Sequence, residues 1–158
     1  MEKQFVIQIG DIDHLEGLIK LATSFRDELG RSEPSDADFK ASIKALLLDG
    51  DTEFIVALDE AGDCVGFIQQ RYRYSMWASG REACIEDLYV APESRRRSVG
   101  SRLVEYAVAS AQAKNCRSIA LDTNELNEPA IYLYKRLGFS SASSRFPGGQ
   151  QLWFERPL

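Results

Sequence analysis

The sequence predicts an α/β fold with a mixed sheet of about seven strands and four helices. Stretches with the two-residue alternation of strands are interleaved with stretches of helical period, and no linker or repeat divides the chain. A composition of 44% hydrophobic and 27% charged residues is typical of a globular protein with a buried core. A length of 158 residues suits one domain, so we expect residues 1–158 to form a single domain.

The first part of the chain predicts one strand followed by two helices. Residues 4–9 alternate as a strand does, and Asp11 or Asp13 is a suitable N-cap for the helix that follows. Gly30 is suited to end that helix, because glycine tolerates the left-handed conformation common there. The apolar stripe of the first helix is formed by Ile12, Leu15, Leu18, Ile19 and Ala22. The stripe of the second helix is formed by Phe39, Ile43, Leu46 and Leu47.

The middle of the chain predicts three strands. Residues 54–58 and 64–74 are joined by a short turn at 59–63, which makes them an antiparallel hairpin. A loop at 75–82 then leads to a strand at 83–90.

The last part of the chain alternates helices and strands. A connector at 91–98 leads to a helix at 99–115, a strand at 116–123 and a helix at 127–138. Strands joined through a helix run parallel, with a right-handed crossover, so this section should be parallel and the hairpins at either end antiparallel. The two closing strands are expected at 139–143 and 150–157.

Composition and charge exclude several classes of protein. The formal net charge, 19 − 24 = −5, disfavours general nucleic-acid binding. One histidine and three scattered cysteines do not form a zinc-ligand set, so we expect no metal. The cysteine pattern also does not suggest a disulfide framework, so we expect a cytoplasmic location. We expect no secretory signal, and no apolar run approaches the roughly 20 residues of a membrane helix.

Residues 85–101 are the most informative stretch, because a strand there runs into a basic loop that opens a helix. The first turn of a helix exposes unpaired N–H groups and the positive end of the helix dipole, which together bind phosphate. Three consecutive arginines, Arg95 to Arg97, would reinforce that attraction. Ser98 can cap the helix or donate to phosphate, and Gly100 lets a ligand approach the backbone. A solvated arginine run before a capped helix is the alternative interpretation.

Two segments carry motifs that together point to one family. Residues 85–101 read IEDLYVAPESRRRSVGS, and residues 127–139 read NEPAIYLYKRLGF. Both resemble motifs of the GCN5-related N-acetyltransferases (GNAT), and the order of elements fits that family from residue 4 to 157. The core [Gln/Arg]-x-x-Gly-x-[Gly/Ala] is matched from Arg95 to Gly100, with Ser98 in place of the first glycine. The resemblance implies a GNAT fold and transfer of acetyl from acetyl-CoA to a primary amine, by direct attack in a ternary complex.

The resemblance also implies where acetyl-CoA binds. The strand ending in Leu-Tyr-Val would splay from its neighbour, and the pantetheine arm would pair with its exposed backbone as an added strand does. Backbone from Arg96 to Ser101 would hold the pyrophosphate, and the arginines would attract the other phosphates. The implied cofactor-binding residues are Leu88, Tyr89, Val90, Arg95, Arg96, Arg97, Ser98, Val99, Gly100, Ser101 and Asn127.

Acetyl transfer to an amine needs a base, an acid and a donor for the oxyanion. A strand N–H near Leu88 is the natural oxyanion donor. The resemblance places Tyr134 beside the sulfur as the acid, while a packed core tyrosine is the reading that the pattern alone favours. Glu86 is the preferred base, directly or through water. Asp87 points to the opposite face of an ideal strand, although a β-bulge could exchange the two carboxylates.

The resemblance also implies that the amine binds between the first two helices and the loop after the long strand. We expect Asp87, Trp77 and Tyr72 to contact it, because carboxylates and aromatic faces suit a cation. The substrate is then a small-molecule or peptide amine, and the IED pattern resembles the diamine and polyamine branch. A non-catalytic acyl-CoA sensor is the alternative function, and a nucleic-acid contact through the arginines is a third. A homodimer is plausible through the terminal strands.

Overall fold

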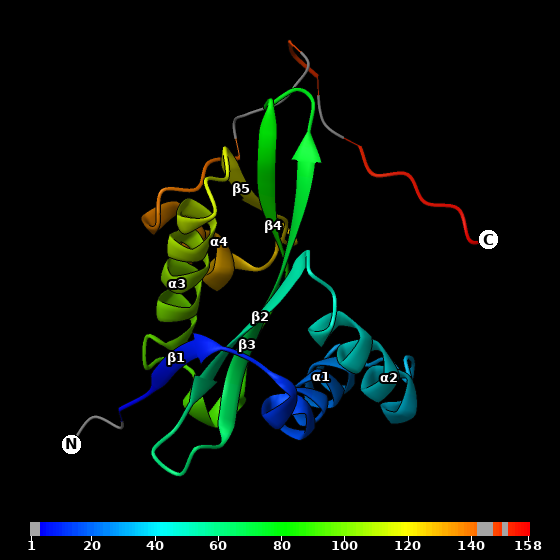
Figure 1. Cartoon of the computed structure of the whole chain (residues 1–158), viewed down its shortest axis with the longest axis vertical. Coiled ribbons are helices and arrows are strands. Elements are labelled where there is room, and N and C mark those ends of the chain that lie inside the picture. The colour runs from blue at the N-terminus through cyan, green and yellow to red at the C-terminus, as the bar shows by residue number, and fades with distance from the viewer. Residues whose placement is uncertain (1–3, 142–146, 150–151) are drawn as a thin grey trace. The chain divides into compact units, whose positions relative to one another are not determined.

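The computed structural model describes residues 4–141, 147–149 and 152–158 (Figure 1). The chain separates into two compact units, Met1–Asp122 and Thr123–Leu158. In the described part of both units, no helix combines the length and the apolar character needed to cross a membrane.

The first unit contains one mixed five-stranded sheet with the strand order β1-β2-β3-β4-β5. Each of the first four strands pairs antiparallel with its neighbour, and β4 pairs parallel with β5. The mixed sheet and its parallel section are therefore as predicted. The strands are β1 (Val6–Ile9), β2 (Thr52–Leu58), β3 (Cys64–Ser75), β4 (Gly80–Val90) and β5 (Ser118–Leu121). The helices are α1 (Leu15–Glu28), α2 (Asp36–Leu47) and α3 (Val99–Ala113), with short 3-10 turns at Ile12–His14 and Pro92–Ser94.

Local capping explains where the first two helices begin and end. Asp11 caps the turn before α1, and the Ser35 hydroxyl accepts from the Asp38 N–H at the start of α2. At the end of α1, Gly30 takes a φ of +70°, and its N–H donates to the Asp27 carbonyl. The next N–H, of Arg31, donates back to the Arg26 carbonyl 3.1 Å away. This Schellman motif needs a left-handed residue, so Gly30 ends the helix as predicted.

The sheet has helices on both faces (Figure 1). On one face, α1 and α2 cover a cluster that includes Leu18, Phe67 and Tyr89. On the other face, Ala111 of α3 packs with Tyr72 and Ala83. The two faces therefore bury different residues of the same two strands, β3 and β4.

A β-bulge at Glu86 decides which face each residue of β4 meets. Gln69 of β3 pairs with Asp87, but the next residue, Gln70, pairs with Ile85. Glu86 is thus an extra residue in the ladder, and such a residue shifts the alternation by one. Ala83 before the bulge packs on the α3 face, whereas Asp87 and Tyr89 after it lie on the α1 and α2 face.

The second unit contains α4 (Glu128–Arg136). The side chain of Asn127 caps it by accepting from the Ala130 N–H, and its Nδ2 contacts the Thr123 hydroxyl at 3.3 Å. These bonds fix the start of the helix close to the predicted residue 127.

The prediction of about seven strands is wrong, because five strands occur in the described residues. Residues 139–141 and 152–157 form no strand, and residues 142–143 and 150–151 of the same predictions lie outside the described residues. Trp153 and Phe154 are 88% and 86% exposed. An apolar alternating pattern forms a strand only where a neighbouring strand satisfies its backbone hydrogen bonds. Residues 152–157 pair with no strand among the described residues.

Candidate active site

A small cavity lies between α1, α2 and the sheet within the first unit. Its volume is about 200 Å³. Its apolar walls include Phe25, Leu29, Pro34, Phe39 and Phe67. Its charged lining residues are Arg26, Arg31, Glu33 and Asp87. The predicted region between the first two helices therefore holds a cavity, and Asp87 is the predicted site residue that lines it.

Asp87 reaches the cavity because the bulge turns it toward α1 and α2. Burial raises the pKa of its carboxyl above the ordinary value of 3.8, and the nearby charges of Glu86 and Asp122 raise it further. A carboxylate whose charge is poorly solvated gains most from a cationic ligand. A raised pKa inside a cavity is also the property expected of a general base.

Glu86 is placed differently from its neighbour. Its carboxylate forms a 2.7 Å ion pair with Arg71 of β3, and it does not line the cavity. Its side chain retains 31% of its exposure, so solvent can still reach it. Glu86 therefore contributes negative charge beside Asp87 while its own charge is compensated by Arg71.

The open side of β4 carries the backbone groups predicted to bind the cofactor. The parallel pairing with β5 extends from Glu82 to Ile85 and stops there. Because the Ala91 N–H donates to the Val65 carbonyl, Leu88 and Val90 fall at the positions whose N–H and C=O groups face away from β3. Beyond Ile85, this edge of β4 has no partner strand among the described residues, and it is the edge at which the sequence predicts the pantetheine arm.

The loop before α3 bends through two residues with positive φ. Arg96 has a φ of +59° and Ser98 a φ of +61°, and the helix begins at Val99. Left-handed residues next to extended or helical ones turn successive N–H groups toward the same side, which forms a concavity suited to an anion. Arg96, Arg97 and Ser98 are exposed around this bend.

The conformation of Ser98 yields a stability prediction. A residue with a Cβ costs about 1–2 kcal/mol in the left-handed region, so Ser98→Gly should raise the free energy of unfolding by about 1 kcal/mol. Ala109→Gly is the matched control, because Ala109 is exposed in the middle of α3. This substitution should lower the free energy of unfolding by about 1 kcal/mol. Urea denaturation of both variants measures the two changes, and a loss of stability in Ser98→Gly would contradict the assigned conformation.

Arg95 is engaged within the protein. Its Nη2 donates to both carboxylate oxygens of Glu28, at 2.7 and 2.8 Å, and its Nε donates to the Val90 carbonyl at 2.9 Å. Hydrogen bonding from Arg95 holds the pKa of Glu28 below its usual value. Tyr89 completes the group, because its hydroxyl donates to Glu28 and its ring lies under the guanidinium. Arg95 therefore ties the end of β4 to the end of α1.

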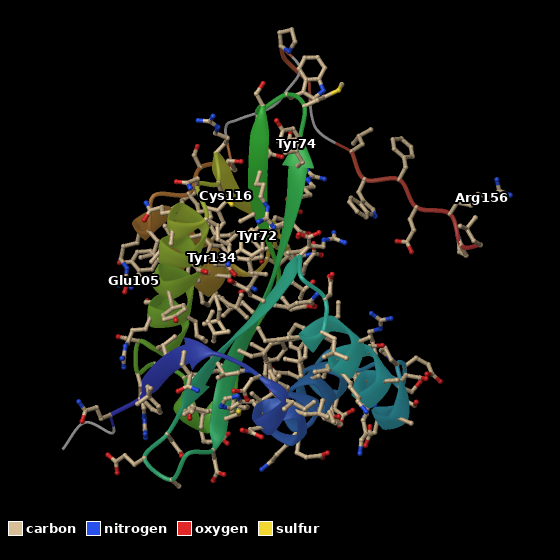
Figure 2. All side chains as sticks on the ribbon, viewed as in Figure 1. Tyr72, Tyr74, Glu105, Cys116, Tyr134 and Arg156 are labelled. Carbon is tan, nitrogen blue, oxygen red and sulfur yellow. The ribbon has the colours of Figure 1, made fainter. Side chains whose placement is uncertain are left out.

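Tyr72 and Trp77 lie away from the cavity. Tyr72 is 3% exposed on the α3 face, where its hydroxyl donates to Glu53 at 2.7 Å and accepts from Gln70 at 2.8 Å (Figure 2). Burial, reinforced by the Glu53 charge, raises the pKa of Tyr72 to about 12. Trp77 is 68% exposed in the turn between β3 and β4. The aromatic pattern did not reveal that Tyr72 packs under α3 or that the long hairpin carries Trp77 away from the cavity.

Removing the Tyr72 hydroxyl should therefore affect stability and leave the amine site unchanged. In Tyr72→Phe, the buried Gln70 amide keeps its bond to the Ala107 carbonyl but loses another, and Glu53 loses a donor. We expect the free energy of unfolding to fall by about 1–3 kcal/mol, with KM for any amine substrate unchanged. Thermal melts and steady-state kinetics measure the two quantities, and a raised KM at constant stability would return Tyr72 to the substrate site.

Tyr134 and Asn127 belong to the second unit. The Tyr134 ring packs at a tilt against Phe139, with ring centroids 6.1 Å apart, and Asn127 caps the helix that carries Tyr134. The two residues stand at the two ends of α4, seven positions apart, as the motif predicts.

Sequence reasoning missed two parts of the site. Arg31 lines the cavity, and Glu28 anchors Arg95, although neither was a candidate. The sequence did contain a signal for Arg31, namely the predicted helix end at Gly30. The residue after such a glycine is held by a backbone hydrogen bond to the helix, so its position is fixed.

Comparison with known proteins gives one consistent group. The model of the acetyltransferase (GNAT) family matches residues 16–139. The chain is 33% identical over 123 residues to the thialysine N-epsilon-acetyltransferase of Bos taurus, which covers 70% of this chain and 72% of the relative. A solved probable acetyltransferase has a TM-score of 0.83 at 24% identity, covering 96% and 99% of the two chains. The aminoglycoside N-acetyltransferase AAC(6')-Iy, solved in complex with CoA, has a TM-score of 0.78 at 20% identity, covering 96% and 98%.

Proposed function

Because the chain belongs to the acetyltransferase (GNAT) family and is an acetyl-CoA-dependent N-acetyltransferase, we propose that its acceptor is a primary amine bound beside Asp87. The acceptor cavity is small, since ligand pockets are usually about 300–1,000 Å³ and this one is about 200 Å³. A slender amine is therefore the acceptor that the cavity favours.

The observation that carries this proposal is the order of features along β4 and the loop after it. Asp87 lines the cavity, Leu88 follows with backbone groups that face the open edge, and the bend at Arg96 and Ser98 lies beyond Val90. An acetyl donor paired with the open edge would have its phosphates near the bend and its acyl end near Asp87. The backbone groups and the bend fit such a ligand. Of the three arginines predicted to bind the cofactor, Arg96 and Arg97 are exposed, and Arg95 is tied to Glu28.

We assign the proton transfers as follows. Acetyl-CoA supplies an activated acetyl group, and the amide C–N bond forms as the thioester C–S bond breaks. Asp87 holds the ammonium and accepts the proton that must leave before attack, and the Leu88 N–H is a donor for the developing oxyanion. Tyr134 donates the proton that lets CoA leave as a thiol. The second proton lost by the amine nitrogen restores Tyr134 through solvent.

Glu86 is the second candidate for the base, acting through a water molecule. Its carboxylate is already paired with Arg71, and this is why we prefer Asp87. No residue in this scheme forms an acyl intermediate, so attack is direct, in a ternary complex.

Two further properties belong to the same proposal. The family match extends across the boundary at residue 122, which supports one catalytic domain over residues 1–158. The three cysteines are free thiols, which suits the reducing cytoplasm. Light scattering of the purified protein tests the homodimer that we propose.

The decisive experiment measures thiol release from acetyl-CoA against a panel of amines. We expect turnover with slender primary amines, namely diamines and amino acids with side-chain amines, and little with aminoglycosides. Acetyl-CoA binding by calorimetry with no thiol release against any amine would overturn catalysis in favour of an acyl-CoA sensor.

A further inference from the structure

Arg31 lines the cavity from a fixed position at the end of α1. It is the residue after Gly30 in the Schellman motif, so its own N–H is bonded to the Arg26 carbonyl. Its side chain is exposed, and no carboxylate of the described residues lies within ion-pair distance of it. The backbone is therefore held in place while the guanidinium has no acidic partner in the described protein.

The neighbouring Arg26 shows the opposite situation. Its guanidinium donates to Asp36 at 2.8 Å, to Asp27 at 2.9 and 3.0 Å, and to the Pro34 carbonyl at 2.8 Å. These bonds brace α1 against the start of α2, and they compensate the charge of Arg26. Of the two arginines that line the cavity, Arg31 is the one available to a ligand.

The charges that remain around the cavity are of both signs. Asp87 is anionic and half-buried at the sheet. Glu33 is anionic and Arg31 cationic, and both are exposed on the connection between α1 and α2. Phe25, Phe39 and Phe67 provide apolar surface in the cavity walls. A ligand that pairs with all three charged groups has an ammonium, an apolar chain and, at its far end, a second ammonium beside a carboxylate.

We propose that the acceptor is a free amino acid acetylated on its side-chain amine, and that Arg31 binds its α-carboxylate. Asp87 then holds the reacting ammonium and Glu33 the α-ammonium. The inference rests on the proposed function and adds to it the substrate class and a specificity-determining residue. A guanidinium binds a carboxylate through two parallel N–H···O bonds, which fixes the orientation of the amino acid as well as its charge.

This arrangement disfavours a polyamine in the cavity. A diamine long enough to span it would pair its second ammonium with Glu33, but it has no carboxylate for Arg31, whose positive charge would then repel that ammonium. A lysine residue within a protein would also lack the contact with Arg31, because its α-carboxyl group is part of an uncharged peptide bond. The diamine substrates suggested by the IED pattern therefore differ from the amino acid by the negative charge of its α-carboxylate. The contribution of that charge can be tested.

The test compares three acceptors of nearly equal length: lysine, lysinamide and 1,5-diaminopentane. For the wild-type protein, we expect kcat/KM for lysine to exceed that for each of the other two. In Arg31→Gln, the ratio of lysine to lysinamide should fall about tenfold, because charge-assisted hydrogen bonds are lost while the reacting amine is unchanged. Lys44→Gln removes the same charge from an exposed position of α2 outside the cavity, and should leave the ratio unchanged.

Calorimetric titration of lysine into the protein with CoA bound provides a second readout. Lysine should bind more weakly to Arg31→Gln, and lysinamide should bind equally to both forms. An equal ratio of lysine to lysinamide in the wild type and in Arg31→Gln would overturn the role of Arg31 while leaving N-acetylation intact. Absence of turnover with every amine would instead contradict the proposed function itself.

Discussion

Asp87→Asn should lower kcat/KM for the amine by about 10²–10⁴-fold, the range that a positioned general base supplies. The amide keeps the shape of the carboxylate but neither attracts an ammonium nor accepts its proton. KM for acetyl-CoA should change little, because the groups that we propose for the cofactor are the backbone of β4 beyond Asp87 and the loop before α3. Steady-state kinetics with each substrate varied in turn measures both effects.

Glu86→Gln is the matched control for Asp87→Asn. The two carboxylates are adjacent in sequence, but the bulge sends them to different surroundings. We expect Glu86→Gln to lower kcat/KM much less, since its main contact is the ion pair with Arg71. A larger loss in Glu86→Gln than in Asp87→Asn would move the base to Glu86.

The pH dependence provides an independent test of the same assignment. The base must be ionised to work, so kcat/KM should fall as the pH drops through the pKa of Asp87. Burial and nearby negative charge raise that pKa above 3.8, so this acidic limb should lie above the range of an ordinary aspartate. The limb should disappear in Asp87→Asn, and its persistence there would contradict the assignment.

Stability separates lost chemistry from lost folding. Because the pKa of Asp87 is raised in the folded state, the folded protein binds this proton more tightly than the unfolded chain does. Ionisation of Asp87 therefore lowers the free energy of unfolding as the pH rises through its pKa. Asp87→Asn should be at least as stable as the wild type at neutral pH, so a loss of activity there comes from the site.

Tyr134→Phe should lower kcat by about 10²-fold or more, with acetyl-CoA binding unchanged. Without the hydroxyl, the thiolate must leave before a proton reaches it, although water can replace the donor in part. The ring remains and keeps its contact with Phe139. Thiol release measures kcat, and calorimetry measures binding of acetyl-CoA.

Tyr132→Phe is the control that isolates this effect. It makes the same substitution two positions earlier on the same helix, at a side chain that is 70% exposed. We expect its turnover to match the wild type. Unchanged turnover in Tyr134→Phe would remove Tyr134 as the acid and leave protonation to solvent.

The helix boundaries could be predicted because their signals are local. Ser35, Gly30 and Asn127 act through bonds to residues two to four positions away, and a sequence pattern records such bonds directly. The closing strands could not be predicted in the same way, because a strand depends on a distant partner. This is why residues 152–157 have a strand pattern and no strand.

The choice between the two carboxylates shows the same limit at the site. The sequence places Glu86 and Asp87 on a strand and predicts that they face opposite ways. Which of them faces the cavity depends on the register between β3 and β4, and the bulge settles that register. Tyr72 and Trp77 lie away from the cavity for a related reason, since the pairing of β3 places Tyr72 under α3 and the length of the hairpin places Trp77 in an exposed turn.

The sequence by itself determined the fold class, the family resemblance and the segment that turns from β4 into α3, because each depends on residues close together in the chain. The tertiary structure alone decided that Asp87 lines a small cavity, that Arg95 is bonded to Glu28, and that Arg31 has no acidic partner among the described residues. These properties depend on contacts between residues far apart in the sequence. Burial and ion pairing arise only when such segments meet, and they determine which charges remain available to a substrate.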